Sequence, residues 1–257
     1  MRTRLLPLGI PLVMFAAACS EGTTGAVSLA LTTASALGST AAPQITTAGD
    51  STVIALGNDT IILRSVELVL REIELKAVED AACDTIADND DCEEFETGPV
   101  LVSLPLGATA TETMISVSAP AGQYDKLEFK IHKPSDSDEA AFIAAHPDFN
   151  GVSIRVTGTY SQAGTRSNFT FTSDLEAEQE IELAPPITVS EGAATTVTLR
   201  VDVASWFLNA GGTALVDPAS ANKDQPNEGV VKDRIEASID AFRDDDHDGH
   251  DDDGHEG

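Results

Sequence analysis

Alternating apolar and polar residues, the period-two pattern of half-buried β-strands, recur along most of the chain. The first such run covers residues 27–31, and a loop rich in Ser, Thr, Ala and Gly is expected from about residue 33 to residue 51. The runs 52–56 and 60–63 flank the turn signal Gly57-Asn58-Asp59. Together they predict a β-hairpin.

The stretch of residues 61–78 fits two patterns. Its apolar positions match a helical stripe, but Val66, Leu68 and Leu70 also alternate as in a strand. We favour one long strand with a bulge near Arg71, because the alternation changes face there. The many β-branched residues point the same way.

Seven further strand-like runs are separated by turn signals. They cover residues 100–104, 114–117, 124–132, 152–160, 168–175, 180–183 and 195–203. The spacing predicts a mainly β chain folded as a single antiparallel β-sandwich. One short helix over residues 138–145 should end at His146-Pro147, which makes His146 a loop or cap residue.

Two features are expected near the C-terminal end. Ile235, Ile239 and Phe242 recur at i, i+4 and i+7, which predicts a short amphipathic helix that caps the sandwich. Trp206 and Phe207 end a strand-like run and could form either core or an exposed platform for a ligand. We favour core, because isolated aromatics beside strands are usually buried.

The N-terminus has the order of a bacterial export signal. Arg2 and Arg4 precede an apolar run over residues 5–15, and the small residues 16–18 precede Cys19. This order predicts a signal peptide over residues 1–18. It also favours lipidation of Cys19, which would anchor the chain in the cell envelope, in the outer membrane by our interpretation. Ordinary cleavage after Ala18, which would leave a periplasmic or secreted protein, is the alternative.

Two further cysteines, Cys83 and Cys92, flank a short acidic segment. In an exported protein a disulfide is the expected state of such a pair. A ring of this size would stabilise the fold by only ~2–3 kcal/mol. Metal ligation by the pair is less favoured, because the spacing is not Cys-x-x-Cys and no histidine lies nearby.

The charge of the chain limits its partners. Asp and Glu number 43 against 15 Lys and Arg, so the formal net charge is −28. Such an excess repels phosphate backbones, and direct nucleic-acid binding is excluded on this ground. No established catalytic motif for a nucleophile, a metalloprotease or a phosphate-binding loop is present, so we do not expect an enzyme.

Four blocks stand in a fixed order along the chain: the Pro-Ala-Gly-Gln-Tyr turn of residues 120–124 with the run after it, then residues 146–155, 201–207 and 235–248. They resemble a group of exported bacterial proteins of unknown function, mostly lipoproteins. Members of that group carry one transthyretin-like or immunoglobulin-like β-sandwich domain. The resemblance implies this fold and an envelope location, and it brings no catalytic residue with it.

The last fourteen residues, 244–257, contain only acids, histidines and glycines. Asp244, Asp246 and Asp248, followed by Gly249, match the Asp-x-Asp-x-Asp-Gly opening of calcium loops, and Asp252 and His255 are further candidate ligands. His255 stands where a bidentate Glu would close the site. Zinc, nickel or copper held by His247, His250 and His255 is a second interpretation. A disordered, solvated polyanion is the third.

These expectations divide the chain into four parts: a signal peptide (1–18), a lipid-anchored tether (19–26), a β-sandwich domain (27–243) and an Asp/His-rich tail (244–257). The first functional hypothesis is a non-catalytic envelope lipoprotein that binds an unknown protein or glycan, or that has a structural role. The alternative is a surface lipoprotein that binds a divalent metal, calcium or zinc, through its tail. No cofactor is firmly expected, calcium enters only with that alternative, and the only membrane contact expected is the lipid anchor.

Overall fold

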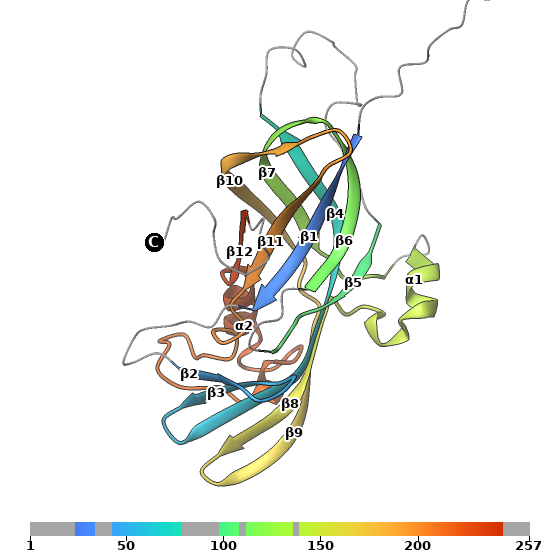
Figure 1. Ribbon diagram of the computed structural model, residues 1–257. Helices are drawn as coiled ribbons and strands as arrows, with labels where there is room; N and C mark the ends of the chain where they lie inside the picture. The colour runs from blue at the N-terminus through green and yellow to red at the C-terminus, as the bar shows by residue number, and fades with distance from the viewer. Residues whose placement is uncertain (1–23, 34–42, 79–97, 108–111, 136–138, 244–257) are drawn as a thin grey trace, which may run out of the picture.

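The computed structural model describes residues 24–33, 43–78, 98–107, 112–135 and 139–243 (Figure 1). Most of them lie in β-strands, as predicted. No helix within these residues is long and apolar enough to cross a membrane. The strands are β1 (Thr24–Thr33), β2 (Gln44–Thr47), β3 (Thr52–Leu56), β4 (Asp59–Ala77), β5 (Val100–Ser103), β6 (Glu112–Pro120), β7 (Gly122–Ile131), β8 (Ile154–Gln162), β9 (Thr165–Ser173), β10 (Ala177–Val189), β11 (Ala194–Val201) and β12 (Ile239–Arg243).

The strands form two sheets that pack as an open sandwich, and this confirms the predicted fold class. One sheet has the order β12-β11-β1-β6, and the other contains β10-β7-β4-β3-β2 together with β5, β8 and β9. All strand pairs are antiparallel except β1 with β11, which is parallel. The described helices are α1 (Ala140–Ala145) and α2 (Glu228–Glu236), and two 3-10 turns precede or follow them, η3 (Pro147–Phe149) after α1 and η4 (Pro218–Ala221) before α2.

Strand β4 is the spine of the larger sheet. Its first half pairs with β3 and β8, and its second half pairs with β5 and β7. The register with β7 shifts between Arg71 and Glu74, and Glu72 has a positive φ of 52°. This is the bulge predicted near Arg71, so the strand interpretation of residues 61–78 is confirmed. In Figure 1 the hairpins β2–β3 and β8–β9 extend beyond the part of the larger sheet that faces β1 and β11.

Two predicted turns are confirmed. Gly57, with φ +64°, joins β3 to β4 at the expected position. Strand β6 ends at Pro120 and β7 begins at Gly122. The Tyr124 hydroxyl donates a hydrogen bond to the Pro120 carbonyl at 2.9 Å, and the ring is buried, so the tyrosine locks its own turn.

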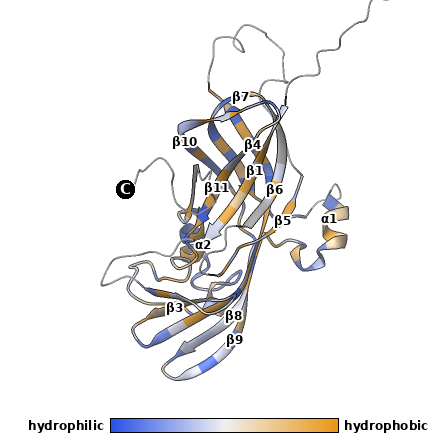
Figure 2. Cartoon of the chain, viewed as in Figure 1, coloured by the Kyte–Doolittle hydropathy of each residue, from blue (hydrophilic) through white to orange (hydrophobic). Residues whose placement is uncertain are grey.

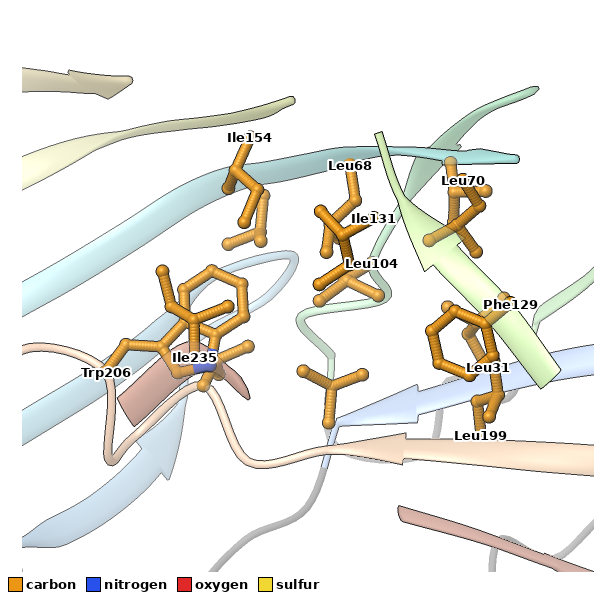
Figure 3. Packing of buried hydrophobic residues seen from close by; sticks show 14 of the residues in the cluster. Leu31, Leu68, Leu70, Leu104, Phe129, Ile131, Ile154, Leu199, Trp206 and Ile235 are labelled. Carbon is orange, nitrogen blue, oxygen red and sulfur yellow. The ribbon is translucent and has the colours of Figure 1, made fainter. Parts of the chain in front are cut away.

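Hydrophobic and hydrophilic residues alternate along parts of the strands (Figure 2), and the buried apolar side chains form one continuous core. At one end of that core, Leu31 of β1 and Leu199 of β11 lie near Phe129 of β7 (Figure 3). At the other end, Trp206 and Phe207 are fully buried. The Phe207 ring meets the Phe171 ring edge to face at 5.3 Å. The prediction that the aromatic pair is core is confirmed.

The C-terminal helix is present, but its extent was predicted wrongly. Helix α2 ends at Glu236, and Ile239–Arg243 is the strand β12, which pairs with β11. The cause is tertiary: β11 would otherwise present unpaired backbone groups at a sheet edge, and β12 satisfies them. A local spacing of i, i+4 and i+7 carries no information about a partner strand that is distant in sequence.

Three smaller boundaries also differ from the predictions. The expected loop of residues 33–51 contains β2, which is paired with β3. Strand β1 begins at Thr24, so the last three residues of the expected tether belong to the sheet. Helix α1 begins at Ala140 rather than at residue 138, and His146 is its C-cap, with its N–H donating to the Phe142 carbonyl. The role of His146 as a cap is therefore confirmed.

Candidate functional site

The sites predicted from sequence motifs lie outside the described residues. This holds for the signal peptide, for Cys19, for the Cys83–Cys92 pair and for the candidate metal ligands Asp244, Asp246, Asp248, Asp252 and His255. Within the described ranges, no group of three or more His, Cys, Asp or Glu side chains is placed to hold a metal ion. Cavities and charge clusters of the sandwich are the remaining candidate sites.

A pocket of about 630 Å³ lies where the end of β11, helix α2 and the start of β12 meet. We call it the Arg–Asp pocket, because two arginines and two aspartates line it. In Figure 1, α2 and β12 lie beside the end of β11. The pocket is lined by Arg200, Asp202, Ser205, Ala210, Val230, Asp233, Arg234, Ala237, Ser238 and Ile239.

The turn after β11 forms one wall and is held by its own polar groups. The Asp202 N–H donates to the Ser238 carbonyl at 2.9 Å, which ties this turn to the chain between α2 and β12. The Asp202 carboxylate accepts from the Ala204 N–H at 3.1 Å, and the Ser205 hydroxyl donates to the Asp202 carbonyl at 2.9 Å. The wall therefore has a fixed shape.

Arg234 of α2 also lines the pocket. Its guanidinium NH2 group donates to the carbonyls of Asn209 at 2.7 Å and of Ala210 at 3.3 Å. Its Nε is buried and has no hydrogen-bond partner within the described structure. The guanidinium is thus held by neutral carbonyls, and its positive charge is not consumed by a carboxylate at these bonds.

The floor of the pocket rests on the core. The Trp206 Nε1–H donates to the Ser238 hydroxyl at 2.7 Å, and that hydroxyl donates to the Ile235 carbonyl at 2.6 Å. Both Trp206 and Ile235 are fully buried. They lie close together in Figure 3, on the side of the core where Ile154 lies. The pocket is therefore built on a rigid part of the fold.

Asp202 lines the pocket with a carboxyl group whose pKa is shifted. Burial raises the pKa of its carboxyl above the usual value, although the N–H groups of Ala204 and Ser205 and the charge of Arg200 act in the opposite direction. A carboxylate with a raised pKa is under-solvated in its charged form. It would gain from a further hydrogen-bond donor or a cation.

A second cluster of charges lies at the bulge of β4. Glu139, with 6% of its side chain exposed, lies 2.7 Å from His132 Nε2 and 3.3 Å from the Arg71 guanidinium, and it accepts from the Ser135 N–H at 3.2 Å. Burial raises the pKa of Glu139, but these three partners outweigh burial and the net direction is down. The group is satisfied internally and holds the start of α1, which has no buried residue of its own, against β4 and β7.

The sequence offered no direct signal for the Arg–Asp pocket. Arg200 and Asp202 are two residues apart on an extended segment, and this spacing predicts that their side chains lie on one face. Arg234 comes from a distant part of the chain, and only the docking of α2 brings it to the same cavity. A search for runs of basic residues could not find such a pair.

No family model matches the chain, and no curated protein matches it. Among solved structures, MbnP from Methylosinus trichosporium is similar at 15% identity with a TM-score of 0.40, over 82% of this chain and 87% of that one. A likeness of this size identifies neither the family nor the activity of the chain.

Proposed function

We propose that this chain is a non-catalytic protein of the bacterial cell envelope whose β-sandwich binds a small ligand in the Arg–Asp pocket. The observation that carries the proposal is the pocket itself, where four charged side chains from two distant segments converge on a rigid scaffold. Concave sites with a few fixed polar groups above an apolar base are the usual form of small-molecule sites. A volume of about 630 Å³ falls within the range such sites occupy.

The chemistry of the lining supports binding over catalysis. Both hydroxyls of the pocket, Ser205 and Ser238, donate to backbone carbonyls, and neither has a histidine beside it among the lining residues. A serine nucleophile needs an adjacent general base. The described polar groups are thus arranged to hold a molecule rather than to attack one.

The pocket can be tested with a library of small metabolites, screened by ligand-observed NMR against residues 19–257, which we call the mature chain. A matched variant, Ala210→Trp, places a large side chain at an exposed position of the pocket wall without touching the core. We expect compounds that bind the mature chain and lose binding in Ala210→Trp. Binding unaffected by the variant, or no binding at all, would refute the proposal.

The envelope location is a proposal from the sequence around Cys19. Expression with a labelled fatty acid should give a lipid-modified protein in the membrane fraction, and Cys19→Ala should abolish the label. A Cys19→Ala variant that keeps the label would show that the lipid is not on Cys19, and an unlabelled wild type in the soluble fraction would favour ordinary secretion.

A second candidate function is divalent-metal binding by residues 244–257. It is favoured by the Asp-x-Asp-x-Asp-Gly order from Asp244 to Gly249. Calorimetric titration with calcium and with zinc should compare the mature chain with a version ending at Arg243. Saturable binding by the longer chain alone would support it, whereas equal behaviour of the two would exclude the tail as a site.

A further inference from the structure

Strand β9 lies at an edge of the larger sheet, because β8 is its only strand partner within the described part of the chain. In an antiparallel ladder, alternate residues turn their backbone N–H and C=O groups away from the partner strand. The Thr172 N–H points outward, since it donates to the Asn222 side-chain oxygen at 2.8 Å. By the same alternation, the backbone N–H and C=O groups of Arg166 and Asn168 also point outward.

The fold itself covers the second half of this edge. Asn222, the C-cap of η4, accepts from the Thr172 N–H, and its side-chain nitrogen donates to the Thr170 carbonyl at 3.4 Å. One side-chain amide therefore takes the place of a neighbouring strand there. Within the described residues, the outward backbone groups of Arg166 and Asn168 have no such partner. The first half of the β9 edge is open.

The open half of β9 lacks the features that usually protect an edge strand. Its register with β8 runs without a shift from Thr165 to Ser173, so no bulge bends it away from a partner. The strand contains no proline and no lysine. Its one charged side chain, Arg166, donates to the Thr159 hydroxyl of β8 at 3.1 Å. The edge is therefore a straight template for a further strand.

The β8–β9 hairpin also differs from the rest of the chain in charge. Residues 151–173 contain Arg155 and Arg166 but no Asp or Glu, although the whole chain carries −28. Such a net charge keeps copies of a protein apart. The hairpin extends beyond the part of the larger sheet that faces β1 and β11 (Figure 1), so two copies that meet there keep most of their acidic surface apart. Exposed charges more than about 8 Å apart are largely screened at physiological salt.

The other described edge strands suit a second copy less well. Acids occur in β6 at Glu112, in β10 at Glu178, Glu180 and Glu182, and in β12 at Asp240. Strands β2 and β5 contain no acid, but each has only four residues, and short edge strands pair poorly. Strand β9, with nine residues, is the long acid-free edge among the described strands.

We propose that the open half of β9 pairs with β9 of a second copy of this chain, in an antiparallel dimer with two-fold symmetry. Asn222 covers the edge at Thr170 and Thr172, so Arg166 and Asn168 are the positions left for pairing. Arg166 of one copy then lies opposite Asn168 of the other, and the two residues exchange backbone hydrogen bonds. This register places no like charges opposite each other. The inference does not depend on the Arg–Asp pocket.

Sedimentation equilibrium tests whether the dimer forms. The sample is the mature chain with Cys19→Ala, which prevents a disulfide between copies through that residue. It is studied in about 0.15 M salt, where repulsion between the acidic surfaces is screened. The average mass should rise from that of one chain toward that of two between about 10 μM and about 1 mM protein. A chain that stays monomeric up to about 1 mM would overturn the inference.

Three variants of one residue locate the interface. Asn168→Pro removes the outward N–H, takes no hydrogen bond from β8, and should abolish the dimer. Asn168→Lys places a lysine opposite Arg166 of the second copy and should weaken dimerisation about 5-fold or more. Asn168→Asp places an acid opposite the same arginine, so the dimer should be as tight as that of the wild type or tighter.

Matched controls make the same charge changes outside the hairpin. Asn150 is exposed before β8, and Asn150→Lys and Asn150→Asp should leave dimerisation close to that of the wild type. Circular dichroism melting checks that each variant is folded, and the two charge variants decide the test if Asn168→Pro does not fold. A dimer that Asn168→Lys weakens no more than Asn150→Lys does would lie on another surface and would overturn the inference.

Discussion

Helix α2 carries two basic residues that face different surroundings, and the contrast separates structural charge from charge available to a ligand. Lys232 lies 2.7 Å from Asp174 and 2.7 Å from Glu228, so its charge is neutralised within the fold. Arg234, two residues later, donates to backbone carbonyls at the edge of a pocket. The same helix thus fixes the fold through one side chain and shapes the candidate site through the other.

Asp174, the partner of Lys232, and Asp202 of the Arg–Asp pocket differ in the same way. Asp174 follows β9 and accepts from Lys232 and from Lys223, which lower the pKa of its carboxyl to about 2. Asp202 follows β11, and burial raises the pKa of its carboxyl. A lowered pKa means that the fold stabilises the charged form, and a raised pKa means that the fold penalises it. The two aspartates should therefore respond oppositely to the loss of charge.

The largest expected effect comes from removing Trp206, which lies in the core beneath Ser238 of the pocket. Trp206→Ala should lower the free energy of unfolding by about 3–5 kcal/mol, because a fully buried indole leaves a cavity. Chemical denaturation measures the loss. Trp206→Phe, which fills most of the space but removes the hydrogen bond to Ser238, is the control and should cost clearly less. Equal losses would show that the hydrogen bond, rather than the packing, holds the floor.

The next effect is the loss of the Asp174 ion pairs. Asp174→Asn should lower the free energy of unfolding by about 1–2 kcal/mol near neutral pH. The folded pKa lies below the usual 3.8, so the stabilisation is present above about pH 4 and is lost as the pH falls toward about 2. Denaturation of wild type and variant across this range should converge at the acid end. A difference that persists unchanged to pH 2 would contradict the assignment.

A smaller effect of opposite sign is expected at Asp202. The pKa of Asp202 is raised in the folded protein, so this carboxyl group stabilises the fold at low pH, where it is protonated. Its contribution to the free energy of unfolding is lost as the pH rises through the folded pKa. Asp202→Asn keeps an oxygen that can accept from the Ala204 N–H and removes the charge. Its melting temperature at neutral pH should equal or exceed that of the wild type. A clear decrease would show that the Asp202 charge stabilises the fold and would erase the contrast with Asp174.

The smallest effect on stability is expected at Arg200. Its side chain is exposed at the rim of the pocket, and exposed charges contribute at most about 1 kcal/mol. Arg200→Gln should therefore lower the free energy of unfolding by no more than about 1 kcal/mol. Chemical denaturation provides the check, and a clearly larger loss would make Arg200 a structural residue.

Local patterns in the sequence were sufficient for much of the fold. The bulge of β4 could be predicted because the alternation of apolar residues changes face at Arg71, and the turn at Gly57 because a two-strand pattern flanks it. Trp206 and Phe207 were correctly placed in the core. Each of these predictions depends on residues that are close in sequence.

Features made by distant pairing could not be predicted in this way. Strand β12 exists because β11 offers it a free edge, and its five residues alone resemble the continuation of a helix. The parallel pairing of β1 with β11 joins segments that are more than 160 residues apart in the sequence, residues 26–33 and 194–201. The Arg–Asp pocket is lined by residues of β11, of the turn after it, of α2 and of the start of β12, which only the fold brings together. Its charged residues are ordinary surface types until the fold brings them together.

The most direct test of the central claim is a map of where a small molecule binds. Backbone amide shifts of the mature chain should be recorded by NMR with increasing amounts of the tightest compound from the library. The account predicts saturable shifts centred on residues 202–205 and 234–238, which form the walls of the Arg–Asp pocket. Shifts centred on the outer face of β4, β7 and β10, or on the β2–β3 and β8–β9 hairpins, would contradict it.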